Sequence, residues 1–490
     1  MQPVRSMFMK AASLTVAALS FSMSGKAQVS APRPNILILL ADDWGWPSSP
    51  LYGDKMVKTP ALERLAKDGV LFNRAYCSAP SCAPSRGALL TGQDFWRLEE
   101  GANLLGTLPA KFPVYPELLQ KAGYVTGTRA KGWGPGNLAA GGRTEEPCGR
   151  PIGKGDGDFA GFLQRMPADK PFCFWFGSND PHRPYKKGSG IAAGLNPAEV
   201  QVPAFLPDTP EIRSDLCDYY LAVQKFDADV TKAIEALEKS GRYTNTLIFI
   251  TGDNGIPFPH AKTQIYDYGV HQPLAICWPE RVPGGRIVDD FVSFTDFAPT
   301  ILEAAGIPVP EEMTGKSLLP LLLSGKSGQV EPQRDAVVVG LERHVGSYPM
   351  RAIRTKEFSY IRNFATDRYP DNYGRGGPSM EYMIAHKDDS PELKRLYDAS
   401  FGRRPAEELY DMQKDPCELT NLAADPKYAD VKKKMADRLT AYLVKTKDPR
   451  VLGTGEVFDN YRTWAGATEL PLVSQQKMPN GGMVERLKRE

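Results

Sequence analysis

Three short runs of mostly apolar residues, at positions 34–40, 171–177 and 246–251, each end directly in polar residues. An uninterrupted apolar run of this length is typical of a strand that is buried on both faces of a parallel sheet. In open α/β sheets, binding sites lie beyond the carboxyl ends of such strands. The three runs therefore predict a parallel sheet whose functional edge carries the polar residues that follow.

Amphipathic helical patterns separate these runs. The longest covers residues 215–240, where Leu216, Tyr220, Val223 and Phe226 can share one face. Alternation of strands and helices predicts a doubly wound α/β domain that extends to about residue 330. The other predicted helices cover residues 59–69, 85–90, 114–122 and 295–305.

The pattern changes after a stretch rich in Gly, Ser, Gln and Pro at residues 324–333, which is typical of a linker or surface loop. Residues 336–340 and 358–361 are predicted as strands, and residues 426–444 as a helix. A small antiparallel sheet that packs against a helix is the simplest arrangement of these elements. We therefore expect a catalytic domain at residues 28–330 and a smaller α+β domain at residues 331–490 that contributes to the substrate pocket.

The N-terminus has the pattern of a secretory signal peptide. Arg5 and Lys10 precede an apolar run at residues 11–23, and small residues at positions 25–27 offer a cleavage site. A core helix or a membrane anchor is the alternative. The run is too short to cross a bilayer. We expect a signal peptide at residues 1–27 and a mature protein that is secreted or periplasmic, without stable membrane association.

Charge and cysteine content narrow the classes of function. The chain has 490 residues, and its 60 basic and 58 acidic residues give a net charge of +2, which provides no reason to expect nucleic-acid binding. It contains 7 cysteines. An odd number of cysteines in an exported protein calls for an explanation, and one of them need not remain a thiol.

The sharpest motif is Cys82-Ala83-Pro84-Ser85-Arg86, which continues through residues 87–92 as Gly-Ala-Leu-Leu-Thr-Gly. In one interpretation, Ser85 caps a helix after Pro84 and Cys82 is an inert buried thiol. The whole stretch, however, resembles the signature of the formylglycine-dependent sulfatases. That resemblance implies an alkaline-phosphatase-like fold, a sulfatase-maturating enzyme as partner, and oxidation of Cys82 to formylglycine (3-oxoalanine).

The chemistry of a hydrated aldehyde fits these residue types. One of its two hydroxyls attacks sulfur, and the other then expels sulfate, so that one difficult step becomes two. Such a nucleophile needs a cation beside it. Arg86, one helical turn after Cys82, suits that role, and the helix N-terminus adds a partial positive charge.

Acidic residues at two strand ends indicate a metal site. Asp42 and Asp43 follow the first apolar run, and Asp253 and Asn254 follow the third. Together with an oxygen of residue 82 they can form an all-oxygen site of about six ligands, which favours Ca²⁺. Helix capping and a tight turn are the alternatives for the two pairs taken singly; taken together, they match the metal set that the sulfatase resemblance implies.

The resemblance also assigns His182, Lys131 and Lys262 to the site. A histidine at this place in sulfatases contacts the sulfate ester and can protonate the leaving atom, and imidazole suits that task. The two lysines are candidates for binding sulfate oxygens, although a lone lysine is usually a surface residue. Most sulfatases carry a second histidine two residues after the first lysine; here that position is Trp133.

A narrower resemblance points to the heparan N-sulfatase (sulfamidase) branch of the family. It rests on residues 253–266 and on Ser347-Tyr348-Pro349-Met350-Arg351. It implies hydrolysis of a sulfated glucosamine of heparin or heparan sulfate, with His344 and Arg351 as further candidates for substrate binding. The alternatives are an O-sulfatase acting on another glycan, a phosphoester or phosphonate hydrolase with the same nucleophile, and an inactive glycan-binding homologue.

Overall fold

The central sheet is built around the three apolar runs. β1 (Asn35–Ala41) lies between β4 (Phe172–Gly177) and β5 (Thr246–Gly252) and runs parallel to both. All residues of these strands are buried, which confirms the expectation from their composition. Ala41 pairs with Gly252, and Leu40 pairs with Gly177. The carboxyl ends of the three strands therefore meet at one edge of the sheet.

The full order of this sheet is β3-β4-β1-β5-β6-β2-β7, with β8 also paired with β2. β6 is antiparallel to both of its neighbours, and the other pairings are parallel. The predicted mostly parallel sheet is thus confirmed. The remaining strands are β2 (Val70–Tyr76), β3 (Val125–Arg129), β6 (His271–Cys277), β7 (Arg286–Val288) and β8 (Val292–Ser293).

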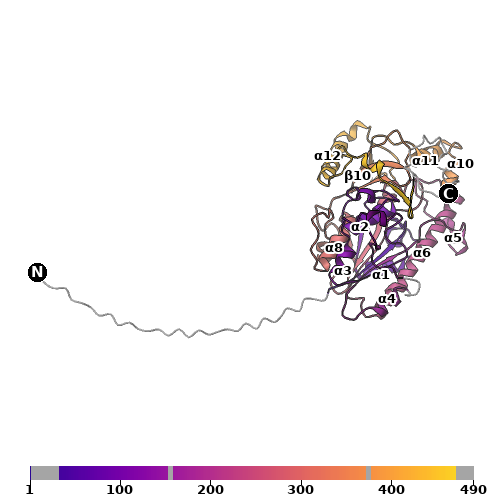
Figure 1. Ribbon diagram of the computed structural model, residues 1–490. Helices are drawn as coiled ribbons and strands as arrows, with labels where there is room; N and C mark the ends of the chain where they lie inside the picture. The colour runs from indigo at the N-terminus through magenta and orange to yellow at the C-terminus, as the bar shows by residue number, and fades with distance from the viewer. Residues whose placement is uncertain (2–32, 153–157, 371–376, 471–490) are drawn as a thin grey trace. The chain divides into compact units, whose positions relative to one another are not determined.

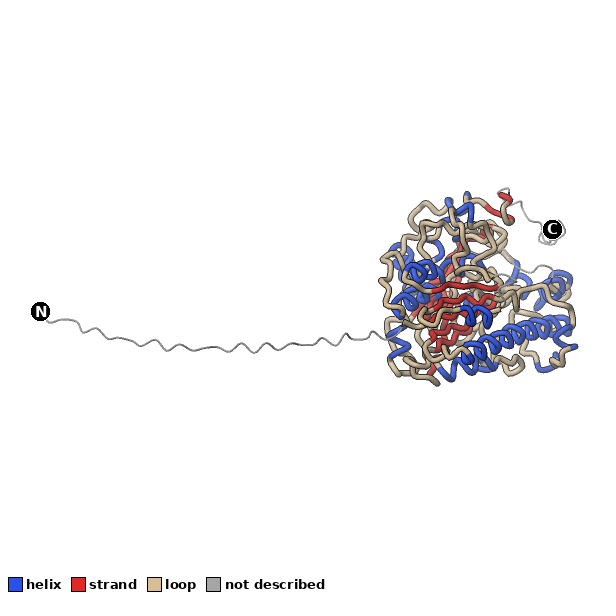
Figure 2. The backbone as a smooth tube through the Cα atoms, turned by 60° about the horizontal axis from the view of Figure 1, so that its bottom comes forward, coloured by secondary structure: helices blue, strands red, loops and turns tan. Residues whose placement is uncertain are grey.

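Helices cover both faces of the sheet, and β1 supplies side chains to both cores. Ile36, Ile38 and Leu40 join one core, whereas Leu37 and Leu39 join the other, as the two-residue period of a strand requires. Figure 1 shows the long helix α6 on one side of the strands and α8 on the other, and Figure 2 shows the strands between helices. The first core includes α2 (Cys82–Thr91), α3 (Tyr115–Lys121) and α8 (Phe297–Ala304), and the second includes α1 (Pro60–Asp68), α4 (Phe159–Arg165) and α6 (Pro210–Lys239).

A second, antiparallel sheet follows in the chain, in the order β12-β11-β10-β9. The helix α12 packs on it through Met435, Leu439 and Leu443. The predicted α+β arrangement is present, with two strands, β10 and β12, that the sequence pattern had not indicated. The elements are β9 (Ala336–Arg343), β10 (Ser347–Thr355), β11 (Phe358–Asn363), β12 (Glu407–Asp411), α10 (Pro378–Ala385), α11 (Pro391–Phe401) and α12 (Ala429–Lys445). The shorter elements are α5 (Ser189–Ala192), α7 (Asp267–Val270), α9 (Leu319–Leu323), α13 (Val457–Asn460), β13 (Thr463–Ala465) and β14 (Thr468–Leu470).

This computed structural model describes residue 1 and residues 33–152, 158–370 and 377–470. Apart from Met1, the expected signal peptide at residues 1–27 lies outside the described residues. The described residues from 33 onward belong to one compact unit, so the division between residues 330 and 331 stays a prediction. Within the described part of the chain, no helix is both long and apolar enough to cross a membrane.

A buried carboxyl group joins α12 to the segment that follows α2. Asp94 accepts hydrogen bonds from the Tyr442 hydroxyl, at 3.2 and 3.1 Å from its two oxygens, and its backbone N–H donates to Thr314. Arg97 acts to lower the pKa of Asp94, but burial has the larger effect. Burial raises the pKa of Asp94 to about 7.

This carboxyl group should make the stability of the fold depend on pH. Because its pKa is higher in the folded chain than the ordinary 3.8, its contribution is largest below about pH 4 and is lost as the pH rises to about 7. We expect the stability of Asp94→Asn relative to wild type to increase by about 2.6 kcal/mol between pH 5 and pH 8. Urea unfolding at both pH values measures this, and a difference that does not change with pH would contradict it.

Candidate active site

Residue 82 occupies the first position of α2, at the edge where the parallel strands end. Ser81, in extended conformation, precedes it as the N-cap residue. The Cys82 side chain is 2% exposed, and its Sγ lies 3.6 Å from Oδ1 of Asp42. The helix N-terminus therefore brings residue 82 against the acidic residues that follow β1.

The two acidic pairs meet because β1 and β5 are parallel neighbours. The backbone N–H of Asp43 donates to Oδ1 of Asp253 at 3.0 Å, and Nδ2 of Asn254 donates to Oδ1 of Asp43 at 2.8 Å. Asp43 has a φ of 73°, so its backbone turns sharply away from β1. A side chain at Gly252 would place its Cβ 2.0 Å from the carbonyl oxygen of Trp44, and the close approach of the two strand ends thus requires glycine there.

Three cations balance the three carboxylates. Lys131 Nζ lies 2.7 and 2.6 Å from the oxygens of Asp42, and Lys262 Nζ lies 2.6 and 2.8 Å from those of Asp43. Arg86 Nε donates to Asp253 at 2.7 Å. Burial acts to raise the pKa of Asp42, but Lys131 and Arg86 outweigh it and hold that pKa below its usual value. Asp42 can therefore be ionised inside the protein.

The donor set fits a hard divalent cation. Oδ1 of Asn254 is buried and, among the described residues, has no hydrogen-bond partner. Ligand atoms of Asp42, residue 82 and Asp253 all lie within 4.8 Å of one another. A buried amide oxygen without a donor is costly unless a donor or a metal meets it. Carboxylate and amide oxygens suit Ca²⁺ better than Zn²⁺.

Trp133 explains how the loop that carries Lys131 is held without a second histidine. Its ring is fully buried in the first core, and its backbone N–H donates to Glu146 at 2.8 Å. The carbonyl oxygen of Lys131 accepts hydrogen bonds from Arg86 at 3.0 Å and from Trp175 Nε1 at 3.1 Å. Trp133 therefore anchors the loop in the core and does not present a ring to the site.

His182 lies on the loop after β4. Its Nε2 is 4.0 Å from Oδ2 of Asp43, and its Nδ1 contacts the carbonyl oxygen of Arg183. Burial lowers the pKa of the imidazole, and Asp43 partly offsets that effect. The structure thus brings His182 together with the acidic residues and the two lysines, as the sequence indicated.

His344 and Arg351 differ in their surroundings. His344 Nδ1 lies 2.8 Å from the hydroxyl of Ser81, beside residue 82. Arg351 is fully buried, and its guanidinium forms ion pairs with Glu342 and Asp448, at 2.5 and 2.7 Å. Its remaining donor reaches the carbonyl oxygens of Leu341 and Met350. Since its donors already face protein acceptors, we correct the expectation for Arg351 and omit it from the substrate-binding residues.

Sequence reasoning missed several residues that position this site. Glu146 holds the Lys131 loop, Ser85 donates its hydroxyl to the carbonyl oxygen of Asp253, and Arg183 contacts His182. The position of Arg183, directly after a candidate catalytic histidine, was the only available signal. No sequence signal pointed to Glu146, because Trp133, from whose backbone N–H it accepts a hydrogen bond, is 13 residues away in the chain.

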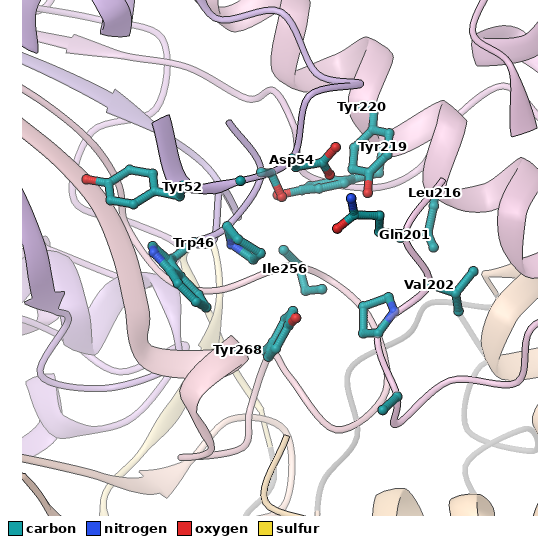
Figure 3. A pocket seen from close by; sticks show the side chains of 15 residues that line it. Trp46, Tyr52, Asp54, Gln201, Val202, Leu216, Tyr219, Tyr220, Ile256 and Tyr268 are labelled. Atoms are coloured by element: carbon teal, nitrogen blue, oxygen red, sulfur yellow. The ribbon is translucent and has the colours of Figure 1, made fainter. Parts of the chain in front are cut away.

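A cavity of about 300 Å³ lies beside the loops that follow β1 and β5. Figure 3 shows Trp46, Tyr52 and Tyr268 on one side of it and Asp54, Tyr219 and Tyr220 on the other. Asp54 accepts a hydrogen bond from the backbone of Met56, and the Tyr219 hydroxyl accepts one from Gly45. Neither lysine nor arginine occurs among the described residues that line it, so the cavity does not suit a sulfate group.

Comparison with known proteins settles the family. The profile of the sulfatase family matches residues 34–149 and 157–307. The chain belongs to the sulfatase family. A second profile, described as the C-terminal region of N-sulphoglucosamine sulphohydrolase, matches residues 259–400 of this sulfatase.

Two curated relatives match most of the sulfatase. Human N-sulphoglucosamine sulphohydrolase is 32% identical over 491 aligned positions, which cover 87% of this chain and 93% of the human protein. An ulvan-active sulfatase of Formosa agariphila is 29% identical and covers 91% of this chain, with 80% of its own length aligned. The first of these supports the resemblance to the heparan N-sulfatase branch.

A solved structure confirms the fold class. It is described as a complex with the substrate D-glucosamine-2-N,6-O-disulfate, and it superimposes with a TM-score of 0.64 at 20% identity. The match covers 85% of this chain and 98% of that chain. The sulfatase therefore has the alkaline-phosphatase-like architecture expected from its sequence.

The unmodified thiol of Cys82 should be unreactive in the folded protein. Burial, with Asp42 and Asp253 nearby, raises its pKa to about 12 despite the two lysines. Since the thiolate is the reactive form, we expect iodoacetamide at pH 8 to modify Cys82 more slowly than the partly exposed Cys417. Peptide mass spectrometry of protein expressed without a maturating enzyme measures both rates. Equal or faster labelling of Cys82 would contradict the buried placement.

Proposed function

We propose that this sulfatase removes the N-sulfate group from glucosamine of heparin or heparan sulfate, with formylglycine at position 82 and Ca²⁺. The observation that carries the proposal is the placement of residue 82 at a helix N-terminus among three carboxylates, three cations and an amide oxygen without a donor. The similarity to human N-sulphoglucosamine sulphohydrolase supports the substrate. The solved complex with a 2-N,6-O-disulfated glucosamine is consistent with it.

Asp42, Asp43, Asp253 and Asn254 would hold the metal, which would supply positive charge to the sulfate and lower the pKa of the attacking hydroxyl. Formylglycine would supply the hydroxyl that attacks sulfur and a second hydroxyl that later releases sulfate. Residue 82 lies at the start of α2, where the N-terminal dipole favours a developing negative charge.

The cationic side chains have separate tasks in this proposal. With the metal in place, Lys131 and Lys262 can turn their ammonium groups from Asp42 and Asp43 toward sulfate oxygens. Arg86 is held by Asp253 and by two backbone carbonyl oxygens, so it stays beside residue 82. Such fixed charges stabilise a transition state without reorganisation at the moment of reaction.

His182 would donate the proton to the leaving nitrogen. Its imidazole lies beside Asp43 at the rim of the site, and its side chain retains 23% exposure. Amines are poor leaving groups unless they are protonated, so general-acid catalysis matters most for an N-sulfate. His344, placed by Ser81 beside residue 82, is proposed to contact the sugar.

An O-sulfatase activity is the second candidate, and the similarity to an ulvan-active sulfatase favours it. We also propose that the protein is exported through a signal peptide at residues 1–27, acts in a secreted or periplasmic location, and depends on a sulfatase-maturating enzyme. The division into domains at residues 28–330 and 331–490 remains part of this proposal.

Sulfate release tests the proposed substrate. We expect protein matured in its native host, with the Cys82 peptide showing the mass of an aldehyde, to release sulfate from N-sulfoglucosamine. Cys82→Ala should reduce the rate by about 10³-fold or more, because the nucleophile is removed. Preference for 6-O-sulfated, N-acetylated glucosamine would favour the O-sulfatase. Higher activity on phosphonate esters would overturn sulfatase specificity, and no turnover by matured protein would indicate a binding homologue.

The amide of Asn254 should contribute to calcium binding. We expect Ca²⁺ to raise the melting temperature of wild type, since a ligand that binds only the folded state stabilises it. Asn254→Ala should weaken Ca²⁺ binding by about 10–100-fold, a loss of roughly 1.4–2.7 kcal/mol, as followed by thermal shift and calorimetry. Asn363→Ala is the matched control, because Asn363 is also buried and its Oδ1 also lacks a partner among the described residues. Equal Ca²⁺ affinity in wild type and Asn254→Ala would remove Asn254 from the metal site.

A further inference from the structure

The side chain of Arg183 connects three parts of the chain beneath the proposed active site. Nη1 and Nη2 donate to the two oxygens of Asp215 on α6, at 2.8 and 2.7 Å. Nε donates at 2.9 Å to the carbonyl oxygen of Pro257, on the loop that leads to Lys262. The guanidinium also lies over the rings of Tyr185 and Phe258, at 4.7 and 4.6 Å. The guanidinium is thus hydrogen-bonded at its edge and packed against aromatic rings.

The C-terminal part of the chain completes this arrangement. Oδ2 of Asp215 accepts hydrogen bonds from both the backbone N–H and the hydroxyl of Ser379, at 3.2 and 2.6 Å. A Cβ at Gly377 would lie 2.7 Å from Nη1 of Arg183, so the backbone there packs directly on the guanidinium. The Arg183–Asp215 pair is nearly fully buried, with side chains that are 4% and 1% exposed.

The backbone of Arg183 contacts His182 directly. Nδ1 of His182 lies within hydrogen-bond distance of the Arg183 carbonyl oxygen. A carbonyl oxygen only accepts, so Nδ1 must carry the hydrogen in this contact. With Nδ1 held in this way, Nε2 is the nitrogen that takes up a proton and, in the charged ring, donates it to the leaving group. Nε2 lies 4.0 Å from Oδ2 of Asp43. The position of the Arg183 carbonyl therefore sets both the tautomer and the direction of the imidazole.

We propose that Arg183 is a positioning residue for catalysis, which acts through His182. The ion pair with Asp215, together with the bond to Pro257, fixes the Arg183 backbone, and that backbone fixes the imidazole toward the leaving group. This inference rests on the proposed function of His182 as the proton donor. A catalytic contact with the substrate is not required of Arg183 itself, since its three donor groups face protein acceptors.

The inference predicts a defect that depends on the leaving group. In Arg183→Met, kcat for aryl sulfates whose phenols have high pKa values should fall by about 10²-fold. With 4-nitrophenyl sulfate, whose leaving group needs little protonation, kcat should fall by no more than about 5-fold, because proton donation then contributes little to the rate. KM should stay within about 2-fold for both, as expected when an interaction made only in the transition state is lost.

A double-mutant cycle shows whether the effect passes through His182. If it does, Arg183→Met added to His182→Ala should cause almost no further loss, since the two residues act as one unit. Arg183→Lys, which keeps the charge but not the planar fork, should give an intermediate defect. Asp215→Asn, which keeps the size but not the charge, should resemble it. These milder variants also serve if Arg183→Met does not fold, as judged by its unfolding transition.

Arg334→Met is the matched control. Arg334 is also buried and pairs with Asp296 at 2.8 Å, but none of its hydrogen bonds reaches the loop that carries His182. Loss of this pair should lower stability without changing the ratio of rates between poor and good leaving groups.

The outcomes separate this inference from the function on which it rests. If His182→Ala shows the leaving-group dependence but the Arg183 and Asp215 variants do not, the positioning role is wrong and the proposed acid stands. A uniform loss in the Arg183 variants that adds to that of His182→Ala also overturns it, because this is what a merely structural residue gives. If His182→Ala itself shows no dependence, the acid role of His182 fails, and the inference fails with it.

Discussion

The burial of three carboxylates at one edge of a parallel sheet is the constraint on which the site depends. Asp42, Asp43 and Asp253 are each no more than 2% exposed. An ionised carboxylate is costly to remove from water unless a counter-charge meets it. Each has its own cation, from α2, from the loop after β3 and from the loop after β5. The segments that carry these cations must therefore converge on this edge of the sheet. In the proposed function, a metal binds where the carboxylates already have counter-charges from the protein.

Much of this convergence could be predicted, because it follows from local signals. The apolar runs became β1, β4 and β5, and parallel pairing necessarily gathered the residues after them. Most helix bounds agreed to within a few residues. α6 starts at Pro210 and not at residue 215, and α2 starts at Cys82 although the helix pattern had suggested Ser85. Pro84 explains the difference, since proline is tolerated in the first turn of a helix, where its missing N–H has no partner to lose. The metal candidates came from the acidic residues that follow two strands, and the family resemblance agreed with them. The lysine candidates came from the resemblance alone. The structure brings both sets together.

Long-range pairing could not be predicted from one sequence. Arg351 looked like a substrate contact because it lies in a motif, but its partner Asp448 is 97 residues further along the chain. Strands β10 and β12 were missed for a related reason: their burial comes from pairing with β9 and β11 and from packing against α12. The spacing of apolar residues shows which faces of a strand or helix are buried. It does not show which residue, far away in the chain, will supply the counter-charge for a buried ionised side chain.

Trp133, which stands where most sulfatases carry a second histidine, can hold the loop in place but cannot reach the substrate. A residue two positions after Lys131 can both hold the loop and reach the substrate. Trp133 keeps the first task through its buried ring and the Glu146 contact, and its burial excludes the second. The imidazoles of the site come from other loops: His182 after β4, near Asp43, and His344 after β9, beside Ser81. Each is oriented by the main chain or by a side chain beside it, so in this sulfatase the geometry of the neighbours of the histidines is as important as the histidines themselves.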